Sequence, residues 1–119
     1  MGVIYESVTI ANNEAVSSAI ELNGRRVTGL IGPTAWTAAD YSFEVYEPIS
    51  AAWRKVIDSA GALVKVTGAA TTTSEVMLLP EIADKLIANR IRVVSSNTGS
   101  EADVNQGAAR TFYVLIETR

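Results

Sequence analysis

Cysteine and histidine are both absent from this 119-residue chain. Without cysteine the protein has no disulfides, no thiolate zinc site and no cysteine nucleophile. Without histidine it lacks the commonest metal ligand and the commonest general base near neutral pH, which excludes serine–histidine hydrolysis. We therefore expect a protein that is not an enzyme and that holds no cofactor and no metal.

Charge is also scarce. Only 19% of the residues are charged, against about a quarter in an ordinary globular domain, and the formal net charge is −3. The basic residues are scattered and outnumbered, whereas nucleic-acid binding requires clustered Lys and Arg. We expect no nucleic-acid partner, and the low charge suggests that another protein covers part of the surface.

Long apolar runs are missing as well. No run approaches the roughly 20 residues that a membrane helix needs, and the first ten residues, MGVIYESVTI, have no basic flank of the kind that precedes a signal peptide. The sequence predicts no membrane partner. It also predicts a chain made in a cytoplasm that stays there or is assembled into something larger.

The chain has enough apolar residues for one domain. The hydrophobic share is 48%, and a domain of this length buries roughly two thirds of the surface that its unfolded chain exposes. No internal repeat or linker is visible. We predict a single domain over 1–119, in which 1–16 form an N-terminal arm or an edge strand.

Short β-rich segments with turn residues between them recur about every ten residues, which predicts an antiparallel β-sandwich of the jelly-roll kind with eight to nine strands. The expected strands are 3–10, 15–22, 27–31, 41–47, 53–57, 62–66, 75–80, 89–96 and 110–118. One stretch, PEIADKLIA, begins with a proline suited to the first position of a helix. It predicts one short helix near 80–88.

Alternation within these strands assigns side chains to the two faces of the sheet. The inward side chains are expected to be Val16, Ala19, Ile20, Leu22, Tyr41, Phe43, Val45, Ile91, Val93, Phe112, Val114 and Ile116. The outward ones include Ser42, Glu44, Tyr46, Arg90 and Arg92. The last strand also has Tyr113 and Leu115 on its second face, so it is either central in the sandwich or covered by another chain.

Asn23-Gly24 joins two strand-like segments and suits a type I′ turn, which needs positive φ at both central residues. We expect a hairpin there, with a bulge near Gly29 in its second strand. Arg25 and Arg26 follow the turn. They either keep a strand edge solvated or make bidentate pairs with carboxylates at a subunit interface.

The loop 97–108 is long for a compact domain and polar throughout. Asn97, Glu101, Asp103 and Asn105 carry oxygen ligands of the kind that bind calcium, although the spacing is not that of an EF-hand; a solvated loop is the alternative. Trp36 and Trp53 are candidates for sugar stacking, although two tryptophans in a sandwich are more often core or interface residues.

Several of these residues together resemble small structural proteins of tailed bacteriophages. The matching residues, between about 17 and 118, are Leu22, Gly29, Ile31, Pro33, Ala35, Trp36, Thr37, Ala38, Trp53, Val56, Asp58, Gly61, Arg90 to Val93, Gln106 and Arg110. The hairpin around Trp53 and the strand RIRV are also similar to galactose-binding-like jelly rolls. The chain departs from that pattern at EPISAAW, where many relatives have Asp-Gly before the tryptophan.

The resemblance implies a virion component, most simply a capsid decoration or cement protein on the capsid surface. Its partners would be the major capsid protein and further copies of itself. A carbohydrate-binding module, using Trp36, Trp53 or Tyr46, and a tail or head–tail adaptor of the same virion are the alternatives. The residues expected at an interface are Arg25, Arg26, Trp36, Tyr46, Trp53, Asn97, Glu101, Asp103, Asn105 and Tyr113.

Overall fold

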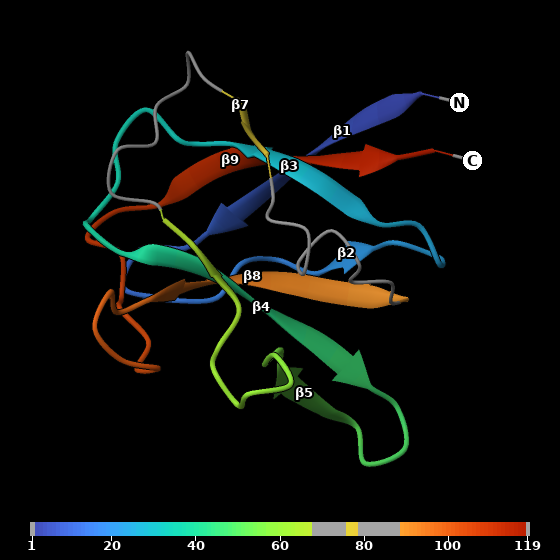
Figure 1. Ribbon diagram of the computed structural model, residues 1–119. Coiled ribbons are helices and arrows are strands. Elements are labelled where there is room, and N and C mark those ends of the chain that lie inside the picture. Colours follow the sequence, from blue (N-terminus) through green and yellow to red (C-terminus); the bar gives the residue numbers. More distant parts are fainter. Residues whose placement is uncertain (1, 68–75, 79–88, 119) are drawn as a thin grey trace.

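The computed structural model describes residues 2–67, 76–78 and 89–118, and in them the chain forms two antiparallel sheets packed face to face (Figure 1). The four-stranded sheet has the order β1-β9-β3-β7, and the five-stranded sheet has the order β2-β8-β4-β5, with β6 pairing to β4. The strands are β1 (Val3–Ile10), β2 (Ile20–Glu21), β3 (Val27–Ile31), β4 (Asp40–Glu47), β5 (Ala52–Lys55), β6 (Lys65–Val66), β7 (Val76–Leu78), β8 (Arg90–Ser96) and β9 (Arg110–Glu117).

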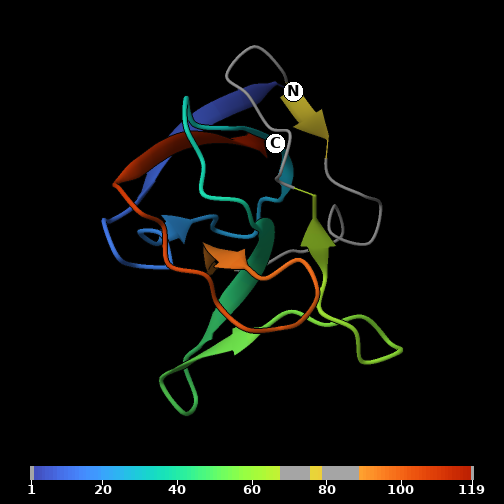
Figure 2. The ribbon, with the colours of Figure 1, turned by 90° about the vertical axis from the view of Figure 1, so that its left-hand side faces the viewer.

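The strand pairs are nested. β1 pairs with β9, β2 with β8, β3 with β7 and β4 with β6. This is the order produced by rolling one long antiparallel ribbon into two sheets, and it is a jelly roll. The predicted all-β sandwich is confirmed, and Figure 2 shows its two layers, with β1 and β9 above and β2, β8 and β4 below.

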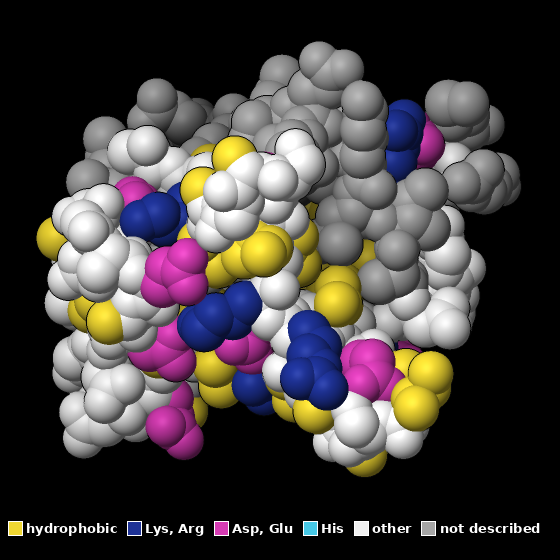
Figure 3. Space-filling view, turned by 60° about the horizontal axis from the view of Figure 1, so that its bottom comes forward, with side chains coloured by type: hydrophobic (Ala, Val, Ile, Leu, Met, Phe, Trp, Pro, Cys, Tyr) yellow, Lys and Arg dark blue, Asp and Glu magenta, His cyan; other side chains and the backbone are white. Residues whose placement is uncertain are grey.

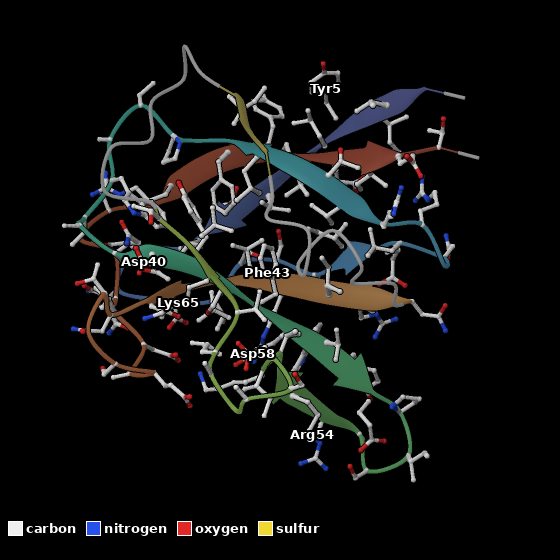
Figure 4. The ribbon with its side chains drawn as sticks, viewed as in Figure 1. Tyr5, Asp40, Phe43, Arg54, Asp58 and Lys65 are labelled. Carbon is white, nitrogen blue, oxygen red and sulfur yellow. The ribbon has the colours of Figure 1, made fainter. Side chains whose placement is uncertain are left out.

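The core fills the space between the sheets with the side chains that alternation assigns to it. Tyr41, Phe43, Phe112, Val114 and Ile116 are fully buried. In Figure 4 Phe43 lies between the layers, whereas Tyr5 projects from β1 away from them. Trp36, in the loop before β4, stacks on Tyr41 with ring centroids 4.6 Å apart, so the core extends beyond the strands.

The Asn23-Gly24 turn forms as predicted, but it does not make a hairpin. Both residues have positive φ, at 52° and 81°, and the Arg25 N–H donates to the Leu22 carbonyl at 3.0 Å. However, β2 before the turn belongs to the five-stranded sheet and β3 after it to the four-stranded sheet. The turn is therefore a corner that carries the chain from one layer to the other.

The predicted bulge is confirmed, since the register of β3 on β9 shifts between Val27 and Gly29. Two inward assignments were wrong, and two side chains predicted to point outward are buried. Ala19 is exposed and Val16 half-buried, because β2 begins only at Ile20. Ser42 and Glu44, expected outside, are 1% and 7% exposed. They do point away from the core, but Ser42 bonds to Ser96 and Glu44 pairs with Arg92 and Lys55.

The predicted helix near 80–88 lies outside the described residues, as do 68–74 of the loop expected before β7. In the described ranges, no helix has the length and apolar character that crossing a membrane would require.

Candidate protein-binding face

The outer face of the five-stranded sheet brings arginines and aromatic rings together. β4 presents Glu44 and Tyr46 on this face, and the register sets Glu44 between Arg92 of β8 and Lys55 of β5, and Tyr46 beside Trp53 of β5. These side chains lie on one face because alternate residues of a strand point to the same side of the sheet. We call the set the Arg–aromatic face, and it comprises Glu44, Tyr46, Trp53, Lys55, Arg90 and Arg92. Figure 3, which turns this side of the molecule forward, shows basic and acidic side chains alternating around apolar ones.

Each arginine of the face lies over a ring. The guanidinium carbon of Arg92 is 4.4 Å from the centre of the Trp53 ring, and that of Arg90 is 5.2 Å from the centre of the Tyr46 ring. The two rings meet edge to face at 5.4 Å. Both separations are within the roughly 6 Å of a cation–π contact. The face is thus a rigid layer of planar groups, and both rings are half-buried.

Glu44 forms ion pairs with two cations of this layer, Arg92 and Lys55. Its Oε1 accepts a hydrogen bond from Arg92 Nε at 2.7 Å, and its Oε2 lies 3.8 Å from Lys55 Nζ. The Glu44 side chain is only 10% exposed and that of Arg92 is 24% exposed. A buried carboxylate is costly unless it is paired, so the pair fixes Arg92 in the position from which it covers Trp53.

The rim of the face consists of exposed ion pairs. Arg90 pairs with Glu21 at 2.6 Å, and that carboxylate raises the pKa of the Arg90 guanidinium above its ordinary value. At the β4–β5 turn, hydrogen bonds from the Ser50 hydroxyl and backbone N–H lower the pKa of Glu47 to about 2. Arg54 also donates to Glu47, at 3.3 Å.

Next to the face, the loop 97–103 is held by a lysine. The Lys65 ammonium donates to the carbonyls of Asn97 and Ser100 at 3.0 and 3.2 Å, and lies 3.8 Å from Asp40. Figure 4 shows Asp40 and Lys65 side by side. Asp103, from the same loop, pairs with Lys55 at 3.2 Å. The loop is therefore joined to the Arg–aromatic face through Lys55.

The predicted site residues divide around this face. Tyr46 and Trp53 belong to it, Asp103 contacts it, and Asn97 lies in the loop beside it, where its Oδ1 accepts from the Gly99 N–H at 2.8 Å. Glu101 and Asn105 are exposed on the same loop. Within the described ranges, no group of three or more acidic side chains is placed to hold a metal ion.

Arg25 and Arg26 both bind to groups of their own chain. Arg25 Nε donates to the Leu22 carbonyl at 2.7 Å and so closes the corner turn. Arg26 makes a bidentate ion pair with Glu117 of β9, in which Nε and Nη2 donate to the two carboxylate oxygens at 3.2 and 3.4 Å. The bidentate geometry expected for an interface is thus present, but it joins the residue before β3 to β9 of the same molecule.

Trp36 belongs to a buried cluster that supports the loops. Its Nε1 donates to the Ala39 carbonyl at 3.0 Å. Beside it, the fully buried Gln106 accepts from the Thr37 N–H at 2.8 Å and from Arg110 at 3.2 Å, and donates to the Thr37 carbonyl and to Ser95 Oγ. Trp36 and Thr37 therefore lie in one cluster with Gln106 and Arg110, which are far from them in the sequence.

Tyr113 lies elsewhere, on the outer face of the four-stranded sheet. β9 is central in that sheet, between β1 and β3, and Tyr113 is 46% exposed beside Ser7 and Ile31. Leu115, on the same face, is 8% exposed. Of the two explanations offered for the apolar second face of this strand, its central position is the one observed.

Sequence reasoning assigned Arg90 and Arg92 outward but did not include them among the site residues, and it missed Glu44 and Lys65. The signal for the arginines was available, because the segment RIR alternates and must place both on the outer face of one strand. The contacts of these arginines with Tyr46 and Trp53 could not be predicted, because the pairing of β8 with β4 joins segments far apart in the sequence.

No protein-family model, curated protein or solved structure matches this chain.

Proposed function

We propose that the chain is a structural protein of a tailed-bacteriophage virion, a capsid decoration protein that binds the outer shell and stabilises neighbouring capsomers. The bacteriophage-like motif supports the assignment to a virion. The observation that carries a binding role is the Arg–aromatic face, because Trp, Tyr and Arg are the residues that most often anchor protein interfaces.

The chemistry of the face suits a protein partner of mixed polarity. Its carboxylates and cations are paired with one another, so no strong field of one sign stands out from it. The two rings, which meet edge to face, and the guanidinium planes instead offer contact area with few rotamers to freeze on binding. Repeated on many copies around a shell, even a modest contact of this kind gives strong attachment through multivalency.

The jelly-roll architecture is compatible with this proposal but does not carry it. The fold serves viral capsid domains and lectins alike, and a fold alone does not specify a function. For a lectin, the geometry of the two tryptophans is unfavourable: Trp36 is stacked on Tyr41, and Trp53 lies under Arg92. A sugar would have to displace Arg92 from Glu44 to reach the Trp53 ring.

The test is the copy number of the chain in purified particles of the phage that encodes it, measured by quantitative mass spectrometry. A decoration protein should be present in hundreds of copies, and a dozen or fewer would indicate a tail or head–tail adaptor instead. Particles without the chain would overturn the proposal.

The face is tested separately by adding variants to shells that lack the protein. Trp53→Ala and Arg92→Ala should each weaken shell binding strongly, because they remove one anchor ring and the cation that orders it. Ile49→Ser is the matched control: Ile49 is 95% exposed in the adjacent β4–β5 turn and outside the face. Equal loss in the control and the face variants would remove the face from the proposal.

A further inference from the structure

β1 is an edge strand, and from Val3 to Ser7 its outer side has no backbone partner within the described ranges. It lies at the end of the order β1-β9-β3-β7, and its register on β9 runs without a break from Val3 to Ile10. At its start, the Gly2 carbonyl accepts from the Thr118 N–H. At its end, the backbone of Thr9 faces the other way and bonds to Ser18.

These two ends fix the direction of every backbone group between them. In an antiparallel ladder the N–H and C=O of successive residues point to alternate sides. Gly2 faces β9 and Thr9 faces away from it, so Val3, Tyr5 and Ser7 also direct their backbone groups to the open edge. The side chains of Val3 and Tyr5 are 46% and 62% exposed.

The open edge of β1 lacks the features that usually protect an edge strand from pairing with another chain. Natural edge strands are kept short, carry lysine or proline, or are bulged. The edge strand β5 has four residues and ends in Arg54 and Lys55, and β2 has two residues. β1 has eight residues, no bulge, no proline and one charge, Glu6.

We propose that β1 pairs antiparallel with β1 of a second copy, so that the two four-stranded sheets become one. The register follows from the strand itself. A two-fold axis at Tyr5 sets Tyr5 opposite Tyr5 and Val3 opposite Ser7, with about six backbone hydrogen bonds between the copies. An axis one residue later would set Glu6 against Glu6, which is destabilising, and would use the edge of Thr9 that Ser18 already occupies.

The pairing does not rest on the proposed function. It would hold for a chain with any role, and a dimeric chain absent from every particle would separate the two proposals. In a decoration protein it would supply contacts between copies, while the Arg–aromatic face, on the other sheet, stays open.

Tyr5 and Tyr113 provide a matched pair of variants. Both are exposed on the outer face of the same sheet, but only Tyr5 is on the edge strand. The full chain should sediment as a dimer, Tyr5→Lys should weaken the dimer by at least about ten-fold because two lysines face each other at the axis, and Tyr113→Lys should leave it intact. Circular dichroism checks that each variant is folded.

Because the chain has no cysteine, Tyr5→Cys tests the register directly. Directly opposed residues of this pair class lie about 5.5 Å apart at Cα, within the range of about 4.4–6.8 Å for a disulfide. Mild oxidation should link Tyr5→Cys into a covalent dimer much faster than Tyr113→Cys. A full chain that stays monomeric up to its solubility limit, equal effects of the two lysine variants, or equal cross-linking of the two cysteine variants would overturn the proposal.

Discussion

Replacing Gln106 by leucine should destabilise the protein more than any single change to its exposed loops. Gln106 is fully buried and its side-chain amide serves Thr37, Ser95 and Arg110. Leucine can make none of these hydrogen bonds. The Thr37 N–H, the Thr37 carbonyl and the Ser95 hydroxyl would each lose a partner inside the protein.

The magnitude follows from the cost of those three groups. A buried polar group left without its hydrogen bond costs about 1–3 kcal/mol, and Arg110 keeps its bond to Thr37 Oγ1 at 3.1 Å. Taking the low end for each, we expect a loss of about 3 kcal/mol from a total stability of about 5–15 kcal/mol. For a chain of this length that corresponds to a fall in Tm of about 12 °C.

The assay is urea unfolding followed by tryptophan fluorescence, with Asn105→Ala as the matched control. Asn105 is the exposed neighbour of Gln106 in the same loop, and its truncation should change the free energy of unfolding by less than about 0.5 kcal/mol. Gln106→Glu should fall between the two, because it keeps the acceptor for the Thr37 N–H and loses the donors. A loss below about 1 kcal/mol for Gln106→Leu would refute the reasoning.

Two further predictions concern the surroundings of the Arg–aromatic face. Hydrogen bonds from Ser50 lower the pKa of Glu47 to about 2 from 4.5. Glu47 therefore contributes stability that is present above pH 4.5 and is lost as the pH falls toward 2. In Glu47→Gln the free energy of unfolding should depend less on pH in that window, and its dependence on salt at pH 7 should be nearly unchanged. Lys65→Met should speed amide exchange in 97–103 and cost about 1–2 kcal/mol. Lys55→Met should cost under about 1 kcal/mol, because the Lys55 pair with Asp103 is exposed and its distance to Glu44 is 3.8 Å, while Arg92 still pairs with Glu44. Both costs are measured by thermal unfolding.

Strand positions and side-chain faces could be predicted from the sequence because both depend on local order. β1, β8 and β9 are rich in β-branched and apolar residues, and all three strands form within a residue of the expected bounds. The corner at Asn23-Gly24 shows the limit. The turn chemistry is local and was predicted, but whether two consecutive strands pair or enter different sheets depends on β8 and β9, which lie far along the chain.

The candidate site was predictable only in part, for the same reason. Tyr46 could be assigned to the outer face from the alternation of its strand, whereas Trp53 was predicted only as a core, interface or sugar-stacking residue. Their cations come from β8, and nothing in the order of residues indicates that Arg92 rests on Trp53. The burial of Glu44 has this origin too: alternation predicts its direction, and the guanidinium that covers it comes from another strand.

The internal pairing of charges explains why composition and charge alone say so little about function here. A charged surface can be recognised from the sequence when charges of one sign outnumber those of the other. Here Glu44 on the face, and Glu21 and Asp103 beside it, each pair with a cation of the same chain. A partner therefore gains little by adding another ion pair, since it must first break an existing one. Binding energy is left to the planar groups, Arg92 and Trp53 above all, and their arrangement depends on the buried Glu44. On this argument, recognition by the face depends on the fold that aligns β4, β5 and β8.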